Sequence, residues 1–353
     1  MNENNILIGK DMLTGFARDI FKAASVDEET ALLWARVLVW ANLRGVDSHG
    51  VLRIPRYVQG LQMGEIKAKP DMRIEVSAGA MALIEADTAP GPMAMSFAMD
   101  QAISLAHQTH IGWCVVRDIT HAGAVGFYAL QAVEAGMVGI VMTASQPMMA
   151  YAGSRVAGVS TNPLAIAVPG GAHRPLLLDM STSTVSNGKI LRAKDAGEPV
   201  PEGWGITADG QPTIDPNLVK TLLPLGGAKG SGLSVMIECL ASLFCANPLI
   251  EPVHRTGKPL SGRRLNGVAI AVDVVAFGDL DAFGAQVDAL AAALTALPKA
   301  EGVEQIFAPG ERGDSVLAER EEGGIPLPAG TWSRLGKVAG ELGIALPAGI
   351  SGS

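Results

Sequence analysis

Residues 120–130 read THAGAVGFYAL and lie where a strand-like apolar run, Gly112–Arg117, gives way to a helical pattern. At such a junction a doubly wound dinucleotide-binding domain would carry GxGxxG, whose glycines let the backbone approach a pyrophosphate. The glycines present here, Gly123 and Gly126, do not have that spacing. The sequence therefore predicts an α/β protein that is not of the Rossmann type.

Apolar runs on either side of this junction support the α/β class, because short strand-like runs alternate with longer helical ones. The strand-like runs are Met81–Glu85, Gly112–Arg117, Met137–Thr143, Leu164–Val168, Leu176–Leu178, Val268–Val275 and Val303–Phe307. The helical runs are Met93–Ala106, Val125–Ala135, Gly232–Cys245 and Leu280–Leu297.

The two ends of the chain are expected to be helical. Met12–Ala24 has apolar residues at helical spacing, and Asp27 is a plausible N-cap for a helix over Glu28–Leu43. Gly330–Leu342 indicates a last amphipathic helix. We therefore predict a helical N-terminal unit over residues 1–75, joined by a returning tail at about 313–353. Residues 76–312 are predicted to form the α/β region that binds cofactor and substrate.

Composition excludes several classes of protein. The 353 residues are 48% apolar and 18% charged, which favours a large buried core over disorder. A net charge of −8 without a long basic run argues against nucleic-acid partners. The most apolar stretch, residues 231–250, carries Glu238 and Asn247, so a buried helix explains it better than a membrane span. The start of the chain has no signal-peptide pattern, and a cytoplasmic location is expected.

A second glycine-rich run, Gly226–Gly232, fails the P-loop pattern, because Ala228 precedes Lys229 and Gly230 follows it. HExxH, metal-spaced Cys/His pairs and GxSxG are also absent from the sequence. The sequence therefore supports no P-loop NTPase, metalloprotease or α/β-hydrolase, and no metal site is predicted.

One candidate site is the segment RGVDSHGVLRIPRYV at residues 44–58. His49, Arg53 and Tyr57 are spaced four apart, so on a helix they would lie in one stripe and face a common space. A helix N-terminus favours anions, and Arg53 could bind a carboxylate through two hydrogen bonds. Pro55 would delay or kink the helix. A solvated helix face is the alternative explanation of this spacing.

His121 is the second candidate, because it lies at a strand-to-helix junction. Histidine ordinarily titrates near pH 6.5, which suits proton transfer near neutrality.

Several short segments could approach an anion with their backbone N–H groups. They are Gly158–Pro163, Asp179–Ser183, Gly188 with Lys189, the run around Lys229, and Pro309–Arg312. Ordinary tight turns explain each of them equally well.

Taken in order, these segments resemble the malate/L-lactate dehydrogenase family, a non-Rossmann family that includes sulfolactate, ureidoglycolate and diketogulonate dehydrogenases or reductases. The resemblance rests on RGVDSHGVLRIPRYV, THAGAVGFYAL, STNPLAIAVP, LLLDMST with SNGKI, GWGITADGQPTID, LLPLGGAKGSGL and IFAPGER. These seven segments extend over most of the chain. The resemblance implies a sulfolactate dehydrogenase-like α/β fold, dependence on NAD or NADP, and a homodimer that acts on small 2-hydroxy or 2-oxo acids.

The resemblance also implies roles for particular residues. His121 matches the proton-transfer histidine, and His49, Arg53 and Tyr57 match the substrate-side loop. The positions that match dinucleotide contacts are Ser145, Asp179, Met180, Ser181, Lys229, Gly230, Gly310 and Glu311. Gln146 departs from the family pattern, because some relatives carry an acidic residue or Asn there.

Two other functions stay open at this point. The same histidine could manage a proton near nitrogen in an NAD(P)H-dependent reductase of a cyclic imino acid. In a non-catalytic nucleotide-binding protein, His121 would instead be structural. The sequence leaves open the identity of the acid and the choice between NAD and NADP.

Overall fold

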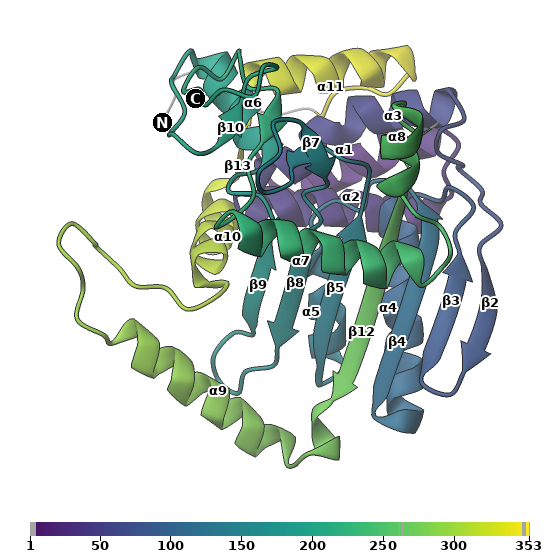
Figure 1. Ribbon diagram of the computed structural model, residues 1–353, viewed down its shortest axis with the longest axis vertical. Coiled ribbons are helices and arrows are strands. Elements are labelled where there is room, and N and C mark those ends of the chain that lie inside the picture. Colours follow the sequence, from purple (N-terminus) through teal and green to yellow (C-terminus); the bar gives the residue numbers. More distant parts are fainter. Residues whose placement is uncertain (1–4, 261, 263, 348–350, 353) are drawn as a thin grey trace.

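The computed structural model describes residues 5–260, 262, 264–347 and 351–352. Figure 1 shows one large sheet with helices on both faces and a layer of helices across one end of its strands. Among the described residues, no helix is long and apolar enough to cross a membrane.

The large sheet has seven strands in the order β2-β3-β4-β12-β5-β8-β9. Their bounds are Arg73–Ala78, Met81–Glu85, Ile111–Ile119, Leu265–Asp273, Met137–Ala144, Leu164–Val168 and Leu176–Met180. β3 and β4 pair in parallel, and every other neighbouring pair is antiparallel. This order differs from the parallel 3-2-1-4-5-6 order of a Rossmann domain, so the predicted non-Rossmann α/β fold is confirmed.

Helices cover both faces of this sheet. α4 (Gly91–Thr109) and α5 (Gly126–Glu134) pack on one face, and α7 (Ala228–Glu238) with the π-helical turn Cys239–Leu243 packs on the other. α4 approaches β4 closely, because a Cβ at Gly112 would lie 1.8 Å from the carbonyl oxygen of Ala102. This glycine brings the helix and strand backbones into contact at the start of β4, the strand that leads to His121 at its other end.

The two ends of the chain share a core. β1 (Asn5–Ile8) lies between β13 (Ile325–Pro328) and β14 (Ser351–Gly352) in an antiparallel sheet. The helices around it are α1 (Lys10–Ala23), α2 (Glu28–Leu43), α3 (Ile54–Gln62), α10 (Glu311–Gly323) and α11 (Ala329–Glu341). Phe21 stacks on Trp34 at 4.2 Å, and Leu335 of α11 is buried in the same cluster. The C-terminal segment therefore packs on the N-terminal helices.

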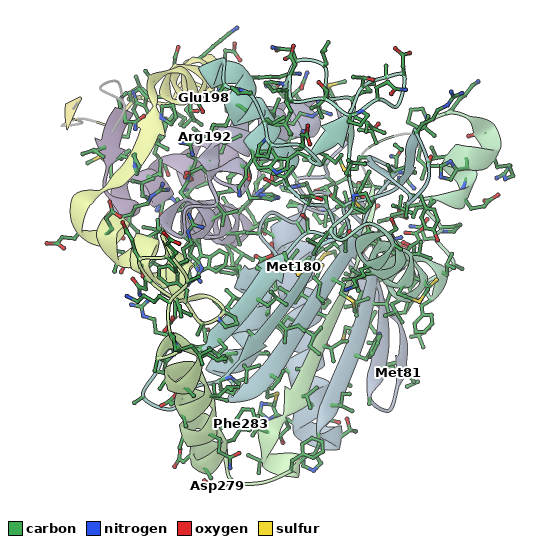
Figure 2. The ribbon with its side chains drawn as sticks, turned by 60° about the vertical axis from the view of Figure 1, so that its left-hand side comes forward. Met81, Met180, Arg192, Glu198, Asp279 and Phe283 are labelled. Carbon is green, nitrogen blue, oxygen red and sulfur yellow. The ribbon has the colours of Figure 1, made fainter. Side chains whose placement is uncertain are left out.

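The remaining elements border the large sheet. A small sheet has the order β10-β11-β6-β7, with bounds Gly205–Ile206, Thr221–Leu222, Met149–Ala150 and Ala157–Val159. α6 spans Asn187–Ala196, α8 spans Glu251–Thr256 and α9 spans Leu280–Thr295. Figure 2 shows Asp279 and Phe283 near the start of α9, at the far end of the sheet from the helical layer.

Three local predictions need correction. Residues 303–307 pair with no strand, and Figure 1 shows this segment away from every sheet edge. The helix expected over Gly232–Cys245 begins earlier, at Ala228, and ends in a π-helical turn. Residues 47–57 do not form one helix: two 3₁₀ turns, Asp47–His49 and Val51–Arg53, precede α3. Gly50 interrupts the helix because its backbone is extended.

Candidate active site

Five strand ends meet at one edge of the large sheet. Leu265 at the start of β12 pairs with Ile119 at the end of β4, and Leu164 at the start of β8 pairs with Met180 at the end of β9. β5 ends between them at Ala144. Figure 2 shows Met180 at this edge, next to the helical layer. Side chains that follow these strand ends are therefore delivered to one place.

A cavity of about 540 Å³ lies between this sheet edge and the residues that lead into α3. His121, Ser145 and Ser181 line it from the sheet side, since they follow β4, β5 and β9. His49, Arg53 and Tyr57 line it from the helical side. This volume is within the range usual for small-molecule sites. The structure thus brings together all four residues that were predicted to act on the substrate.

The turn that carries His49 and Arg53 is held by a buried amide. Asn42 Nδ2 donates to Asp47 at 2.7 Å, and its Oδ1 accepts the N–H of Val51 at 2.9 Å. A Cβ at Gly50 would lie 2.1 Å from Asn42 Oδ1, so only glycine fits there. Arg320 of α10 donates to both carboxylate oxygens of Asp47, at 2.7 and 3.2 Å. The turn is therefore fixed to the end of α2 and to the C-terminal segment.

The imidazole of His121 is held at Nδ1. The Tyr57 hydroxyl lies 2.7 Å from this atom, and the N–H of Gly123 donates to it at 3.2 Å. Because a backbone N–H can only donate, this contact favours a neutral His121 with its proton on Nε2. Burial raises the pKa of Tyr57, so its hydroxyl stays protonated and can donate or accept.

His49 stacks beside His121, with ring centroids 5.5 Å apart and planes inclined by 23°. Its Nδ1 lies 2.9 Å from the Ser48 hydroxyl. Burial and, secondly, the nearby charge of Arg53 lower the pKa of His49 to about 4. His49 is therefore neutral near pH 7 and does not oppose a positive charge on the ring of His121.

Arg53 presents a cation to the cavity. Its Nε donates to the carbonyl oxygen of Ser48 at 2.7 Å, which orients the guanidinium group. Among the described residues, no carboxylate forms an ion pair with Arg53. The two terminal nitrogens are thus available for a planar anion such as a carboxylate.

Two of the predicted cofactor residues line the cavity. Ser145 contacts the Ser160 hydroxyl, and its N–H donates to Asn162 at 3.1 Å. The Ser181 hydroxyl lies 2.9 Å from that of Ser183. These residues add neutral hydroxyl groups to a wall whose cations are arginines.

The other six predicted cofactor residues do not line this cavity. Met180 ends β9, Lys229 is exposed on α7, and Gly310 precedes α10. Glu311 accepts from the N–H of Ala308 at 2.6 Å and contacts His173 Nε2 at 2.9 Å.

Two of these six make close packing contacts. A Cβ at Gly230 would lie 2.4 Å from the carbonyl oxygen of Thr182, so this glycine lets α7 approach that backbone. Asp179 accepts the N–H of Gly126, the first residue of α5, at 2.9 Å. Neighbouring protein atoms displace water from the carboxyl group of Asp179, and this loss of solvation raises its pKa to about 6. Part of the residue remains exposed to solvent.

Arg264 and Gln146 are among the polar lining residues to which sequence reasoning gave no role. Arg264 precedes β12, and nothing in its local pattern marked it. Gln146 was noticed only as a departure from the family pattern, and its partners lie far along the chain. Its amide Oε1 accepts the N–H of Leu260 at 2.8 Å, and its Nε2 donates to the carbonyl oxygen of Gly262 at 3.2 Å.

The cavity wall fits a nicotinamide cofactor. Carboxamide, ribose and phosphate groups are bound by neutral hydroxyls and backbone N–H groups. Ser145, Thr161, Ser181 and Ser183 provide such hydroxyls. Between the last two, the buried Thr182 hydroxyl has no hydrogen-bond partner among the described residues.

The large sheet is mixed, and its strand ends border a cavity lined by two histidines and by Arg53. These features place the chain in a class of α/β proteins distinct from the Rossmann dehydrogenases. A model of the malate/L-lactate dehydrogenase family matches residues 8–336. The chain belongs to this family.

Three similar proteins support this assignment. The chain is 34% identical to malate dehydrogenase of Pyrococcus horikoshii over 98% of both chains. It is 32% identical to NAD(+)-dependent ureidoglycolate dehydrogenase of Escherichia coli O157:H7, over 86% of this chain and 87% of that one. The structure of sulfolactate dehydrogenase from Methanocaldococcus jannaschii matches with a TM-score of 0.85 and 31% identity, covering 97% and 98% of the two chains. The resemblance and the fold predicted from the sequence are confirmed.

Proposed function

We propose that this chain is a nicotinamide-dependent dehydrogenase that interconverts a small 2-hydroxy acid and the corresponding 2-oxo acid. The observation that carries the proposal is the pair formed by His121 and Tyr57 in the cavity that Arg53 also lines. A proton-transfer group and a carboxylate-binding group are the two protein functions that this reaction requires. Family membership and relatives that are named as dehydrogenases of hydroxy acids support it.

Arg53 binds the substrate carboxylate in this proposal. The Ser48 carbonyl holds its Nε, so the guanidinium group keeps one orientation while its terminal nitrogens make paired hydrogen bonds. A bound carboxylate would place C2 and its oxygen next to the histidines. His49, neutral and hydrogen-bonded to Ser48, orients that oxygen.

His121 exchanges a proton with the substrate oxygen through Nε2, because Nδ1 is engaged by Tyr57 and Gly123. With its proton on Nε2 the neutral ring cannot take another proton there, so in the oxidation of a hydroxy acid the ring must first hold its proton on Nδ1. Nε2 then takes the hydroxyl proton and His121 becomes an imidazolium. The Tyr57 oxygen accepts a hydrogen bond from Nδ1–H, and its hydroxyl donates when Nδ1 carries a lone pair. Tyr57 can thus serve both protonation states of the histidine.

The cofactor in this proposal is NAD or NADP, and when bound it accepts hydride from C2 of the hydroxy acid or supplies hydride to C2 of the oxo acid. Ser145 and Ser181 would contact it from the cavity wall. We also assign Asp179, Met180, Lys229, Gly230, Gly310 and Glu311 to dinucleotide binding. Their support is the sequence resemblance alone.

We extend the proposal to a cytoplasmic homodimer. The family resemblance supports it, as do the exposed apolar side chains of Met236, Leu243 and Phe244 on α7 and the turn that follows it. Light scattering at micromolar concentration should give twice the chain mass of 36.5 kDa. A mass near 36.5 kDa would contradict the dimer.

A substrate screen tests the proposed reaction. The protein is mixed with NADH or NADPH and a panel of 2-oxo acids and cyclic imines, and loss of reduced-nicotinamide absorbance is followed. We expect turnover of a 2-oxo acid to a hydroxy acid. Formation of a secondary amine from a cyclic imine alone would favour the imino acid reductase. Quenching of intrinsic fluorescence by NADH with no turnover would favour a non-catalytic nucleotide-binding protein.

A further inference from the structure

The strand that leads to His121 contains a β-bulge. The pairs of the β4–β12 ladder that flank it are Val116 with Gly267 and Ile119 with Leu265. Between these pairs β4 has two residues, Arg117 and Asp118, opposite the single residue Asn266 of β12. Bulges are common beside active sites, where they redirect a side chain. This bulge ends three residues before the proposed proton-transfer group.

The bulge changes which face of the sheet the residues of β4 contact. Before it, Cys114 and Val116 are buried in the cluster under α4 and α5, whereas Val115 lies in the cluster under α7. After it, Ile119 is buried in the first cluster, although an unbroken alternation from Val116 would place it in the second. The extra residue therefore sets the face toward which the chain leaves β4 on its way to His121.

Asp118, within the bulge, has a strained backbone. Its φ is 55°, in the left-handed region that residues other than glycine rarely adopt. Such a conformation persists only where neighbouring contacts enforce it. The N–H of Asp118 donates to Asn266 Oδ1 at 3.1 Å, a side-chain oxygen where a regular ladder would offer a backbone carbonyl. Asn266 therefore stabilises the bulge directly.

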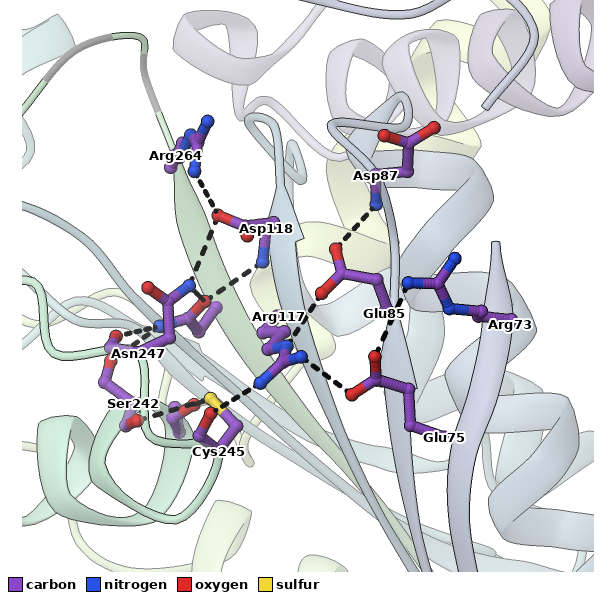
Figure 3. Close-up of polar contacts among 12 residues, drawn as sticks. Arg73, Glu75, Glu85, Asp87, Arg117, Asp118, Ser242, Cys245, Asn247 and Arg264 are labelled. Carbon is purple, nitrogen blue, oxygen red and sulfur yellow. Dashed lines mark hydrogen bonds and ion pairs between the residues drawn. The ribbon is translucent and has the colours of Figure 1, made fainter. Parts of the chain in front are cut away.

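The amide of Asn266 is buried, and it is hydrogen-bonded at both ends. Besides the N–H of Asp118, its Oδ1 accepts from Asn247 Nδ2 at 3.0 Å. Its Nδ2 donates to the carbonyl oxygen of Asn247 at 2.8 Å and to Ser242 Oγ at 3.0 Å. Figure 3 shows Asp118, Asn247 and Ser242 gathered around these contacts. Because a backbone N–H only donates and a carbonyl oxygen only accepts, the contacts fix which end of the amide faces the bulge.

A buried carboxylate holds this network from the α7 side of the sheet. Ser242 lies in the π-helical turn after α7, and its hydroxyl donates to Glu238 Oε2 at 2.8 Å. The other carboxylate oxygen of Glu238 accepts the N–H groups of Leu249 and Ile250, at 2.8 and 3.1 Å. The position of the Asn266 amide is therefore set by elements that lie outside the cavity.

Thr120, immediately before His121, is fixed to the loop that follows β3. Its N–H and its hydroxyl both donate to the carbonyl oxygen of Ala89, at 3.1 and 3.0 Å. The same hydroxyl accepts the N–H of Gly91 at 3.1 Å. A Cβ at Gly91 would lie 2.4 Å from the carbonyl oxygen of His121, so the two backbones are in close contact. The chain between the bulge and His121 therefore has little freedom to absorb a change in the bulge.

We infer that Asn266 is a positioning residue for proton transfer, because its amide closes the bulge in β4 and thereby places the imidazole of His121 beside Tyr57 and the substrate oxygen. The inference rests on the proposed function. Asn266 is itself buried and is not among the described residues that line the cavity, so it acts through the backbone. The competing explanation is that this amide only stabilises the fold.

The first test compares two variants of the same buried network. Asn266→Asp keeps the size of the side chain but removes both N–H donors and turns a carboxylate oxygen toward the carbonyl of Asn247. Ser242→Ala is the matched control, because it removes the contacts to Asn266 and Glu238 and leaves the contact between Asn266 and Asp118 in place.

Steady-state kinetics in H2O and D2O separates the two explanations. For reduction of a 2-oxo acid that wild type accepts, kcat, KM and the solvent isotope effect on kcat are measured, each on the pH-independent part of the profile. A misplaced His121 slows proton transfer and raises the solvent isotope effect. Loss of folded protein lowers the apparent kcat but leaves that ratio unchanged.

We expect Asn266→Asp to lower kcat by about 10- to 100-fold, because small displacements of a reacting group cost much rate. The solvent isotope effect should rise above that of wild type. KM for the oxo acid should stay close to the wild-type value, because Arg53 belongs to the opposite wall. Ser242→Ala should lower the urea concentration at half-unfolding and keep the wild-type isotope effect.

A second pair of variants tests the bulge without changing the buried amide. Asp118→Gly and Asp118→Val both remove the carboxylate, but glycine adopts a φ of 55° without strain and a β-branched residue does not. We expect Asp118→Val to reproduce the loss of kcat and the raised isotope effect, and Asp118→Gly to keep the wild-type isotope effect. This pair decides the inference if Asn266→Asp does not fold.

Unchanged isotope effects in both Asn266→Asp and Asp118→Val would overturn the inference, as would equal effects in Asp118→Gly and Asp118→Val. Absence of turnover on any 2-oxo acid would refute the proposed function instead. Nitrogen-15 NMR of the His121 imidazole, identified by its absence from His121→Asn, would then decide the positioning role. Its signals should shift in Asn266→Asp and not in Ser242→Ala, and unchanged signals in both variants would contradict the inference.

Discussion

Arg53 and Arg264 line the same cavity but are held in different ways. Arg53 belongs to a turn fixed by Asn42, whose buried side chain is hydrogen-bonded at both its amide nitrogen and its oxygen. Arg264 is about half exposed and makes one longer ion pair, with Asp118. A rigid wall suits the group that must align the reacting carbon, because small displacements cost much rate.

The largest effect is expected at His121, on which every substrate depends. His121→Ala should lower kcat by roughly 10²–10⁴-fold, the usual worth of a positioned acid or base. His121→Asn should do nearly as badly, since an amide does not ionise near neutral pH. Steady-state kinetics measures the loss, and fluorescence titration with NADH should show nearly normal binding. An unchanged kcat in His121→Ala would remove the residue from the mechanism.

Arg53→Lys should separate the two arginines. Lysine keeps the charge but loses the planar pair of donors, so kcat/KM should fall by about 10- to 100-fold. The loss should be equal for oxaloacetate and 2-oxobutanoate, because both carry the carboxylate next to the reacting carbon. A near wild-type kcat/KM would exclude Arg53 from carboxylate binding, and a loss confined to oxaloacetate would show that Arg53 does not bind the carboxylate next to the reacting carbon.

Arg320→Gln tests whether the buried contacts fix the turn. Loss of the ion pair to Asp47 should lower kcat about tenfold on both acids, since the turn carries His49 and Arg53. Asp314→Asn is the matched control, because the Arg44–Asp314 pair also joins α2 and α10 but does not touch the turn. Similar kcat losses in both variants would indicate general destabilisation instead.

The smallest expected effect is that of His49 on how the free energy of unfolding depends on pH. Its pKa falls from 6.5 to about 4 on folding, so between these values the unfolded chain binds more protons and stability is lost as pH falls. We expect the urea concentration at half-unfolding to fall when the pH is lowered from 6.5 to 4. This fall should be smaller in His49→Gln than in wild type. Asp179, whose pKa is raised to about 6, acts in the opposite direction, but both proteins share it. The same fall in both proteins would show that folding does not lower the pKa of His49.

The sequence predicted features that depend on neighbouring residues, and it did not predict features that depend on contacts between distant segments. Local signals identified β8 with its exact bounds and the Asp27 cap of α2, whose carboxylate accepts the N–H of Thr30. The spacing of His49, Arg53 and Tyr57 indicated a common space even though the predicted single helix was wrong. The insertion of β12 between β4 and β5 depends on pairing between distant segments, which local patterns do not encode.

Residues held by distant partners were the ones that sequence reasoning missed. Arg264 depends on the strained backbone of Asp118, and Gln146 depends on Leu260, 114 residues away. Neither contact follows from periodicity, capping or turn chemistry. The cofactor positions taken from the resemblance include residues such as Glu311, whose contacts in this chain are within the protein.

The central claim, that His121 and not His49 transfers the proton, is tested most directly by the pH dependence of kcat in both directions. Oxidation should rise and reduction should fall with pH between about 5 and 8, where histidines ordinarily titrate. This dependence should persist in His49→Ala, because His49, with a pKa of about 4, is already neutral there, and it should vanish from the residual activity of His121→Ala. Loss of the dependence in His49→Ala together with its retention in His121→Ala would contradict the account.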